Sequence, residues 1–157
     1  MIELFSRKTF EIGDRPQVLA PIHIDDEVSS LSAILLNEAY YQMLLDGRTE
    51  VEGIMVLKPV YMIPFKAKAW LDLTEKKRAG ASVDEKDIRK HKNDIARLAV
   101  VLEGNKSIHL PEEVRVDMEY FISQYEKEPA ELKNLRIDNI TNTEIINRLR
   151  DIYLKND

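Results

Sequence analysis

Two stretches in the middle of the chain decide its fold: IPFKAKAWLDL at residues 63–73 and KDIRKHKNDIARL at residues 86–98. Each has apolar residues at the spacing of an amphipathic helix, and each carries charge where core residues are expected. In the first stretch, Lys66 lies near the middle of the face that Trp70 and Leu73 share. A lysine drawn toward a core is costly unless it is paired or its ammonium reaches solvent. This mismatch makes Lys66 the sharpest candidate for a functional residue.

The second stretch places His91 inside an apolar stripe and Asp94 on its flank. The stripe consists of Ile88, Ile95, Leu98, Ala99 and Leu102. A histidine on an apolar face is more often a satisfied core residue than a ligand. Asp94 has two alternatives. It pairs with Lys90 one turn earlier, which contributes about 0.3 kcal/mol, or it orients Lys66 from the neighbouring helix, which stabilises poorly but positions well.

The composition is that of a helix-rich globular domain. Of 157 residues, 44% are hydrophobic and 32% are charged, which is enough apolar content to close one core. The absence of cysteine excludes disulfides and thiolate metal sites. No apolar run approaches the length of a membrane span, and no secretion signal begins the chain. We therefore expect a cytoplasmic protein without a membrane partner.

The charge is unevenly distributed along this acidic chain, whose formal net charge is −5. Lysine and arginine are concentrated in residues 58–97, whereas residues 103–132 are mostly acidic. A local basic zone on an acidic protein suits a phosphate-bearing small ligand or an RNA end. The simpler alternative, a solvated helix surface, is the commoner origin of such a zone.

The order of elements predicts an α+β fold, with strands early and helices late. We expect one domain over residues 1–157, with a sheet-and-helix part at 1–62 and a helical part at 63–157. Ser82 with Glu85 and Thr141 with Glu144 have the spacing of a capping box. The first half of the chain is expected to contain a strand at 2–5, an extended piece at 18–22, a helix from Asp25 or Asp26 to Gly47, and one or two strands within 51–61. Four more helices are expected to follow, beginning at Pro64, Ser82, Pro111 and Thr141. The helix that begins at Ser82 is expected to end near Gly104.

Other acidic and histidine residues give no strong metal signal. The cluster Asp25-Asp26-Glu27 lies at an expected helix start, where capping is a more common role than metal binding. His23 and His109 lie beside prolines at the ends of elements, without the spacing of a zinc site. The chain also lacks a glycine-rich phosphate loop and a serine or cysteine nucleophile motif.

Lys66, followed by Lys90-His91-x-x-Asp94-Ile95-x-x-Leu98, resembles the closing motif of the AbiEii-type nucleotidyltransferase-like toxins. This family belongs to the polymerase-β-like nucleotidyltransferase superfamily. Lys66 matches its helix lysine, Lys90 its basic residue and Asp94 its second aspartate. His91 stands where the family usually has its first aspartate, so the motif departs from the pattern at that position.

The start of the chain resembles a later core strand of the same family. Glu3 would take the place of a third metal-binding carboxylate. The family's first signature, a Gly-Ser or Gly-Gly turn before a paired-acid strand, is missing, and we expect it upstream of Met1. The resemblance thus covers residues 1–102 as the latter part of a longer protein. It implies the sheet remnant of a nucleotidyltransferase-like core packed with a C-terminal helical bundle.

The resemblance implies transfer of a nucleotide from a nucleoside triphosphate to an RNA or protein acceptor, with Mg²⁺ as the cofactor. Lys66 would contact the phosphates together with Lys90, Asp94 would serve catalysis by orienting Lys66, and Glu3 would bind the metal. The toxin class implies a cognate antitoxin and a role in phage defence. With one of three expected acids present, we expect the shortened chain to be inactive as a transferase.

Two other functions stay open at this point. The chain is alternatively a non-catalytic helical interaction module, in which Lys66 and Asp94 form a buried structural pair. The basic zone would, in a third hypothesis, bind nucleic acid, although the net acidity argues against it. An unpaired strand edge beside Glu3 would favour a homodimer.

Overall fold

The computed structural model describes residues 3–7, 21–22, 31–102 and 107–155, with side chains from residue 37 onward. The chain forms two compact units, residues 1–46 and 47–157. The fold is α+β, as predicted, and helices make up most of it. The expected single domain stays a prediction, and its internal boundary at residues 62 and 63 falls inside a helix. No helix among the described residues is long and apolar enough to span a membrane.

The first unit contains a three-stranded sheet in the order β1-β3-β2. β1 (Glu3–Arg7) confirms the strand expected at the start of the chain, and it pairs in parallel with β3 (Leu31–Leu36). β2 (Pro21–Ile22) pairs with the other edge of β3, in the antiparallel direction. Residues 18–20 of the expected extended piece and the acidic cluster at residues 25–27 lie outside the described residues.

The helix expected from Asp25 or Asp26 to Gly47 is wrong in its first part, because Leu31–Leu36 forms β3. A short apolar run fits a strand as well as a helix, and here β3 pairs with β1 along most of its length and with β2 at its start. Helix α1 (Glu38–Gly47) begins only after Asn37, whose side-chain oxygen accepts a hydrogen bond from the Tyr40 amide at 3.0 Å.

The second unit begins with a β-hairpin formed by β4 (Arg48–Val51) and β5 (Ile54–Leu57). Both residues of its turn have positive φ, 52° at Glu52 and 80° at Gly53. Positive φ at both central residues is the geometry of a type I′ turn, whose twist matches that of antiparallel strands. The hairpin confirms the prediction of strands in this region, although they begin at residue 48 and end at residue 57.

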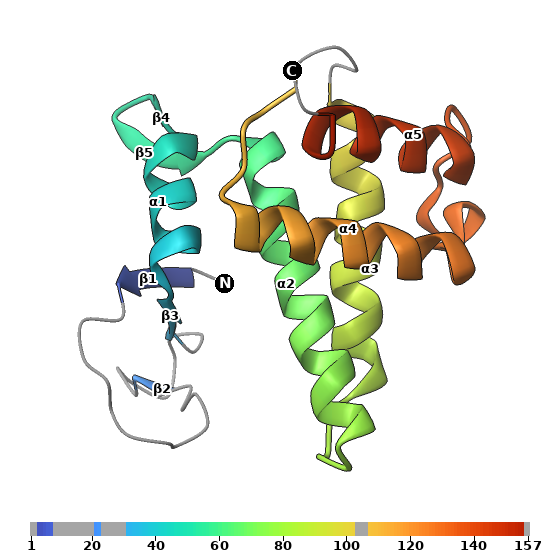
Figure 1. The fold of residues 1–157 in the computed structure, drawn as a ribbon, viewed down its shortest axis with the longest axis horizontal. Coiled ribbons are helices and arrows are strands. Elements are labelled where there is room, and N and C mark those ends of the chain that lie inside the picture. The colour runs from blue at the N-terminus through green and yellow to red at the C-terminus, as the bar shows by residue number, and fades with distance from the viewer. Residues whose placement is uncertain (1–2, 8–20, 23–30, 103–106, 156–157) are drawn as a thin grey trace. The chain divides into compact units, whose positions relative to one another are not determined.

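Four helices form the rest of the second unit, as Figure 1 shows. α2 (Pro59–Arg78) and α3 (Glu85–Val101) lie side by side along most of their length. α4 (Glu112–Lys127) crosses α2, and α5 (Asn142–Tyr153) packs against α3 and α4. A single turn of 3-10 helix, η1 (Leu132–Leu135), joins α4 to α5 and also contacts α3.

Helix α2 begins at Pro59, and the prediction that Pro64 opens it is wrong. Proline suits the first turn of a helix because its missing N–H would be unpaired there in any case. Pro64 instead lies inside the helix, where its missing N–H leaves the carbonyl of Val60 without the usual i−4 donor. The hydroxyl of Tyr153, in α5, donates to that carbonyl at 2.6 Å. The last helix thus repairs the backbone defect that Pro64 introduces into α2.

The helix caps follow the sequence closely at two of three predicted positions. α4 begins directly after Pro111, and α5 has the predicted capping box of Thr141 and Glu144. The capping box expected from Ser82 is wrong: Asp84 caps α3 by accepting a hydrogen bond from the Lys86 amide at 2.8 Å. The carboxylate of Asp84 is a better acceptor than a hydroxyl, and it lies directly before the helix. α3 also ends at Val101, short of the expected end near Gly104.

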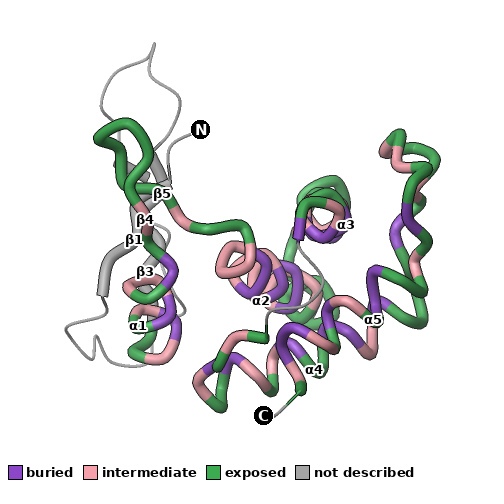
Figure 2. Tube along the Cα trace, turned by 90° about the horizontal axis from the view of Figure 1, so that it is seen from above, coloured by how far each residue is buried: buried purple, intermediate pink, exposed green. Residues whose placement is uncertain are grey.

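The core of the second unit lies between the four helices, each of which contributes buried positions (Figure 2). Its centre includes an edge-to-face contact between Trp70 and Phe121, with ring centroids 5.5 Å apart and planes at 82°. Other fully buried side chains of this core include Ile63, Ile95, Met118, Tyr125, Ile145 and Leu149. Ala67, Ala96 and Ala99 are also fully buried and allow close approach of the backbones around them.

The contact between Tyr153 and Val60 gives a testable prediction. We expect Tyr153→Phe to lower the free energy of unfolding by about 1–3 kcal/mol, because a carbonyl beside a buried side chain loses its donor. Adding Pro64→Ala should recover part of this loss, because the new amide at position 64 can bond to the Val60 carbonyl. Urea denaturation of the single and double variants measures both effects. Tyr120→Phe, on the exposed side of α4, is the control, and equal losses for both tyrosines would contradict the assignment.

The capping box predicts a pH dependence of stability. Hydrogen bonds from the Thr141 side chain and backbone lower the pKa of Glu144 in the folded state. A lowered folded-state pKa stabilises above the unfolded value of about 4.3, and this contribution is lost as the pH falls through the folded value. The melting temperature of the wild type should therefore exceed that of Glu144→Gln above pH 5, and the gap should close toward pH 3. Glu75→Gln, on an exposed turn of α2, is the control for the loss of an exposed carboxylate.

Candidate functional site

Lys66 and Asp94 lie in contact across the two long helices. The Lys66 ammonium, on α2, is 3.5 Å from the Asp94 carboxylate, on α3, and the two side chains are 19% and 26% exposed. The predicted proximity of these residues is therefore present, while their chemical roles stay predictions. Partial burial on rigid helices restricts both side chains, so the pair holds a defined position.

Asp94 also accepts from Arg97, whose guanidinium lies 3.5 Å from its other carboxylate oxygen. The alternative pairing of Asp94 with Lys90 is absent: Lys90 is exposed and makes no ion pair with any described residue. Two cations thus share one carboxylate, which leaves a net positive charge at this point. Such an arrangement can orient a lysine toward an anion and retain charge to attract it.

Lys68 shows that the α2 lysines have different environments. Its ammonium lies 3.2 Å from Asp72 and 3.4 Å from Asp117, which joins α2 to α4. Burial opposes the charge of this ammonium, but the two carboxylates outweigh burial and raise the pKa of Lys68. Lys68 is therefore a structural cation with its charge fully compensated, and Lys66 is not.

The other predicted residues have different surroundings in the described structure. Glu3 lies on β1, opposite Ser32 of β3, in the first unit, and its side chain is outside the described set. His91 is half-buried on α3, His109 is exposed in the segment before α4, and His23 lies outside the described residues. Lys90 is one helical turn before Asp94 and points to solvent-accessible surface.

The described residues do not themselves fit a Mg²⁺ site. No group of three histidine, aspartate or glutamate side chains among them could hold a metal ion. Asp94 is a poor metal ligand in this setting, because its carboxylate already interacts with two cations. The expectation that Glu3 binds the metal stays a prediction.

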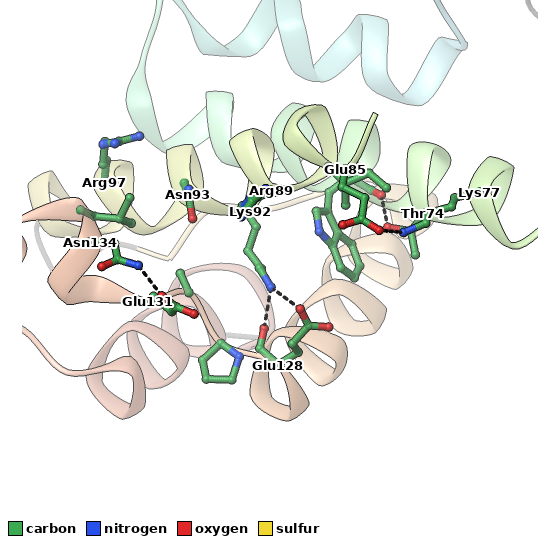
Figure 3. A pocket seen from close by; sticks show the side chains of 15 residues that line it. Thr74, Lys77, Glu85, Arg89, Lys92, Asn93, Arg97, Glu128, Glu131 and Asn134 are labelled. Carbon is green, nitrogen blue, oxygen red and sulfur yellow. Dashed lines mark hydrogen bonds and ion pairs between the residues drawn. The ribbon is translucent and has the colours of Figure 1, made fainter. Parts of the chain in front are cut away.

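The structure adds a pocket that the sequence did not indicate. This cavity of about 760 Å³, which we call the η1 pocket, lies between α2, α3, the end of α4 and η1. Its floor contains three buried residues, Trp70, Lys92 and Ala130. Figure 3 shows the polar side chains around it, including Arg89, Asn93 and Arg97 on successive turns of α3.

Lys92 is the buried lysine among the described residues, with 8% of the residue exposed. Its ammonium donates to the backbone carbonyl of Glu128 at 3.1 Å and to the Glu128 carboxylate at 2.9 Å (Figure 3). Glu128 is the C-cap of α4, so Lys92 places a cation at the negative end of that helix. The sequence contained a signal for this burial, because Ile88, Lys92, Ile95 and Ala99 follow one helical stripe.

A scan against protein-family models, a search of curated proteins and a search of solved structures each found no match to this chain. The resemblance to the AbiEii-type nucleotidyltransferase-like toxins therefore stays a prediction that depends on the motif residues themselves.

A double-mutant cycle tests whether Lys66 and Asp94 interact in solution. We expect Lys66→Met and Asp94→Asn to show a coupling of about 0.5–1 kcal/mol, because both side chains are partly buried but Asp94 is shared with Arg97. Urea denaturation of the two single variants and the double variant measures it. Lys76→Met, an exposed lysine on the same helix, should combine additively with Asp94→Asn. Additive effects for Lys66 as well would show that the pair is absent in solution.

Proposed function

We propose that the chain is part of a nucleotidyltransferase-like protein of the toxin or phage-defence type. In this proposal Lys66 contacts the phosphates of a nucleoside triphosphate, Asp94 positions Lys66, and Lys90 adds positive charge nearby. The protein would act in the cytoplasm on an RNA or protein acceptor. The resemblance alone suggests the metal dependence and the cognate antitoxin. The strand edge beside Glu3 alone suggests the homodimer.

The contact between Lys66 and Asp94 is the observation that carries the proposal. The motif assigns these two residues to one site although 28 positions separate them in the chain, and their charged groups lie 3.5 Å apart. An ammonium has three N–H donors, so pairing with one carboxylate leaves donors for phosphate oxygens. A point cation held on a rigid helix stabilises polyphosphate charge without first being ordered.

The surrounding charges also favour an anion at this position. Arg97 adds a second cation to the same carboxylate, and Lys90 lies exposed on the same helix. Lys68, in contrast, is neutralised by two aspartates. Positive charge is therefore retained near Lys66, where the motif predicts a phosphate.

Calorimetric titration of the full 157-residue chain tests the proposal directly. We expect ATP, GTP, CTP or UTP to give measurable binding heat in the presence of Mg²⁺, with weaker binding in its absence. Lys66→Ala should weaken binding by about tenfold or more, since it removes a charge-assisted contact to phosphate. Lys76→Ala, which removes an exposed lysine elsewhere on α2, should leave binding unchanged.

Two outcomes would contradict this function. Absence of heat with all four nucleotides would favour the alternative, a non-catalytic helical interaction module in which Lys66 and Asp94 are a structural pair. Equal binding by wild type and Lys66→Ala would place the nucleotide elsewhere. A separate assay with labelled nucleoside triphosphates should detect no transfer by this chain alone.

A further inference from the structure

The η1 pocket is distinct from the Lys66–Asp94 pair, although Arg97 borders both. Neither Lys66 nor Asp94 lines it, although both sites use residues of α2 and α3. Its volume of about 760 Å³ lies within the range of small-molecule sites, roughly 300–1,000 Å³.

Most cations that line the pocket are already paired. Lys77 pairs with Glu85, Lys92 with Glu128, and Arg97 with Asp94 outside the pocket. Arg89 differs: its guanidinium has no ion pair or hydrogen bond with any described residue. Lys77 is the main cause of the lowered pKa of Glu85, and Arg89 contributes less. The pocket thus contains one arginine that is available to a ligand among otherwise satisfied cations.

Two further donors accompany Arg89. Lys92 uses its ammonium for two bonds to Glu128, so one of its three N–H groups has no acceptor among the described residues. The Asn93 side chain lines the pocket from the next helical turn after Arg89. These groups can all donate to a ligand oxygen, and a guanidinium can bind a carboxylate with two parallel hydrogen bonds.

The same pocket presents an apolar surface. Trp70, Ile88 and Leu135 line it from α2, α3 and η1, and Pro129 closes it beside the end of α4. Trp70 is 7% exposed and is held by its edge-to-face contact with Phe121. A rigid aromatic wall next to a charged donor is typical of sites that bind an apolar body with one polar end.

We propose that the η1 pocket binds a small organic acid, with one carboxylate on Arg89 and an apolar ring against Trp70, Ile88 and Leu135. The glutamates that line the pocket favour a ligand with a single negative charge. Glu85, Glu128 and Glu131 all border the cavity, so a polyphosphate would meet three carboxylates while gaining one available arginine. A monoanion meets the same arginine with much less repulsion.

Trp70 makes the proposal directly measurable, because it is the only tryptophan of the chain. The probe is 3-phenylpropionate, titrated into the full chain while tryptophan fluorescence is excited selectively. We expect a saturable change in tryptophan fluorescence, with half-saturation in the millimolar range because the probe has few atoms. The neutral analogue 3-phenylpropionamide should bind at least about tenfold more weakly, because it cannot form the charged pair with arginine.

Matched variants test whether the carboxylate of the probe binds to Arg89. Arg89→Gln should weaken 3-phenylpropionate binding about tenfold or more. Arg89→Lys should weaken it less, because lysine keeps the positive charge but loses the two parallel N–H donors of the guanidinium. Lys86→Gln removes an exposed cation of α3 outside the pocket and should leave binding unchanged. Lys66→Met should also have no effect, which separates this test from that of the proposed nucleotide site. Melting curves verify that each variant is folded.

Several results would overturn the proposal. The first is no saturable fluorescence change up to about 20 mM probe, well beyond the range in which a fragment occupies a site. Equal binding of the acid and the amide, or of wild type and Arg89→Gln, would exclude a carboxylate on Arg89. An Arg89-dependent fluorescence change with ATP, at least as strong as that with the monoanion, would exclude the proposed selection for a single charge.

Discussion

The lateral packing of α2 against α3 is the constraint on which both candidate sites depend. The fully buried alanines Ala67, Ala96 and Ala99 permit close approach of backbones in this region. Two ion pairs, Lys66 with Asp94 and Lys77 with Glu85, join the helices at separate points and are consistent with one antiparallel register. A shift of one helix along the other would separate Lys66 from Asp94 and would move Lys92 away from the end of α4.

Three lysines of α2 and α3 make different interactions because their surroundings differ. Lys68 lies between two carboxylates and joins α2 to α4. Lys92 is buried and caps the C-terminal end of α4 through Glu128. Lys66 shares the Asp94 carboxylate with Arg97, so one carboxylate faces two cations there. The three residues are of the same chemical type, and the groups around each of them decide what its charge does.

The sequence predicted those features that depend on local pattern. Helical periodicity located α3, α4 and α5, and the spacing of Thr141 and Glu144 identified the capping box of α5. The motif also predicted the contact between Lys66 and Asp94. The sequence failed where a distant partner decides the outcome. The residues of β3 are helical by pattern but pair with strands on either side, and Pro64 would ordinarily end a helix. The η1 pocket requires four segments to converge, and no local signal indicates that convergence.

The bond from Tyr153 to Val60 also bears on how the second unit folds. Its partners are separated by 93 positions in the chain, so most of this unit must be synthesised before it can form. Until α5 docks, the first turns of α2 carry an unpaired carbonyl at the point where Pro64 interrupts the hydrogen-bond ladder. Long-range contacts of this kind slow folding because chain closure precedes the gain in stability. The start of α2 should therefore become ordered late, together with the last helix, and these two segments should unfold as one cooperative element.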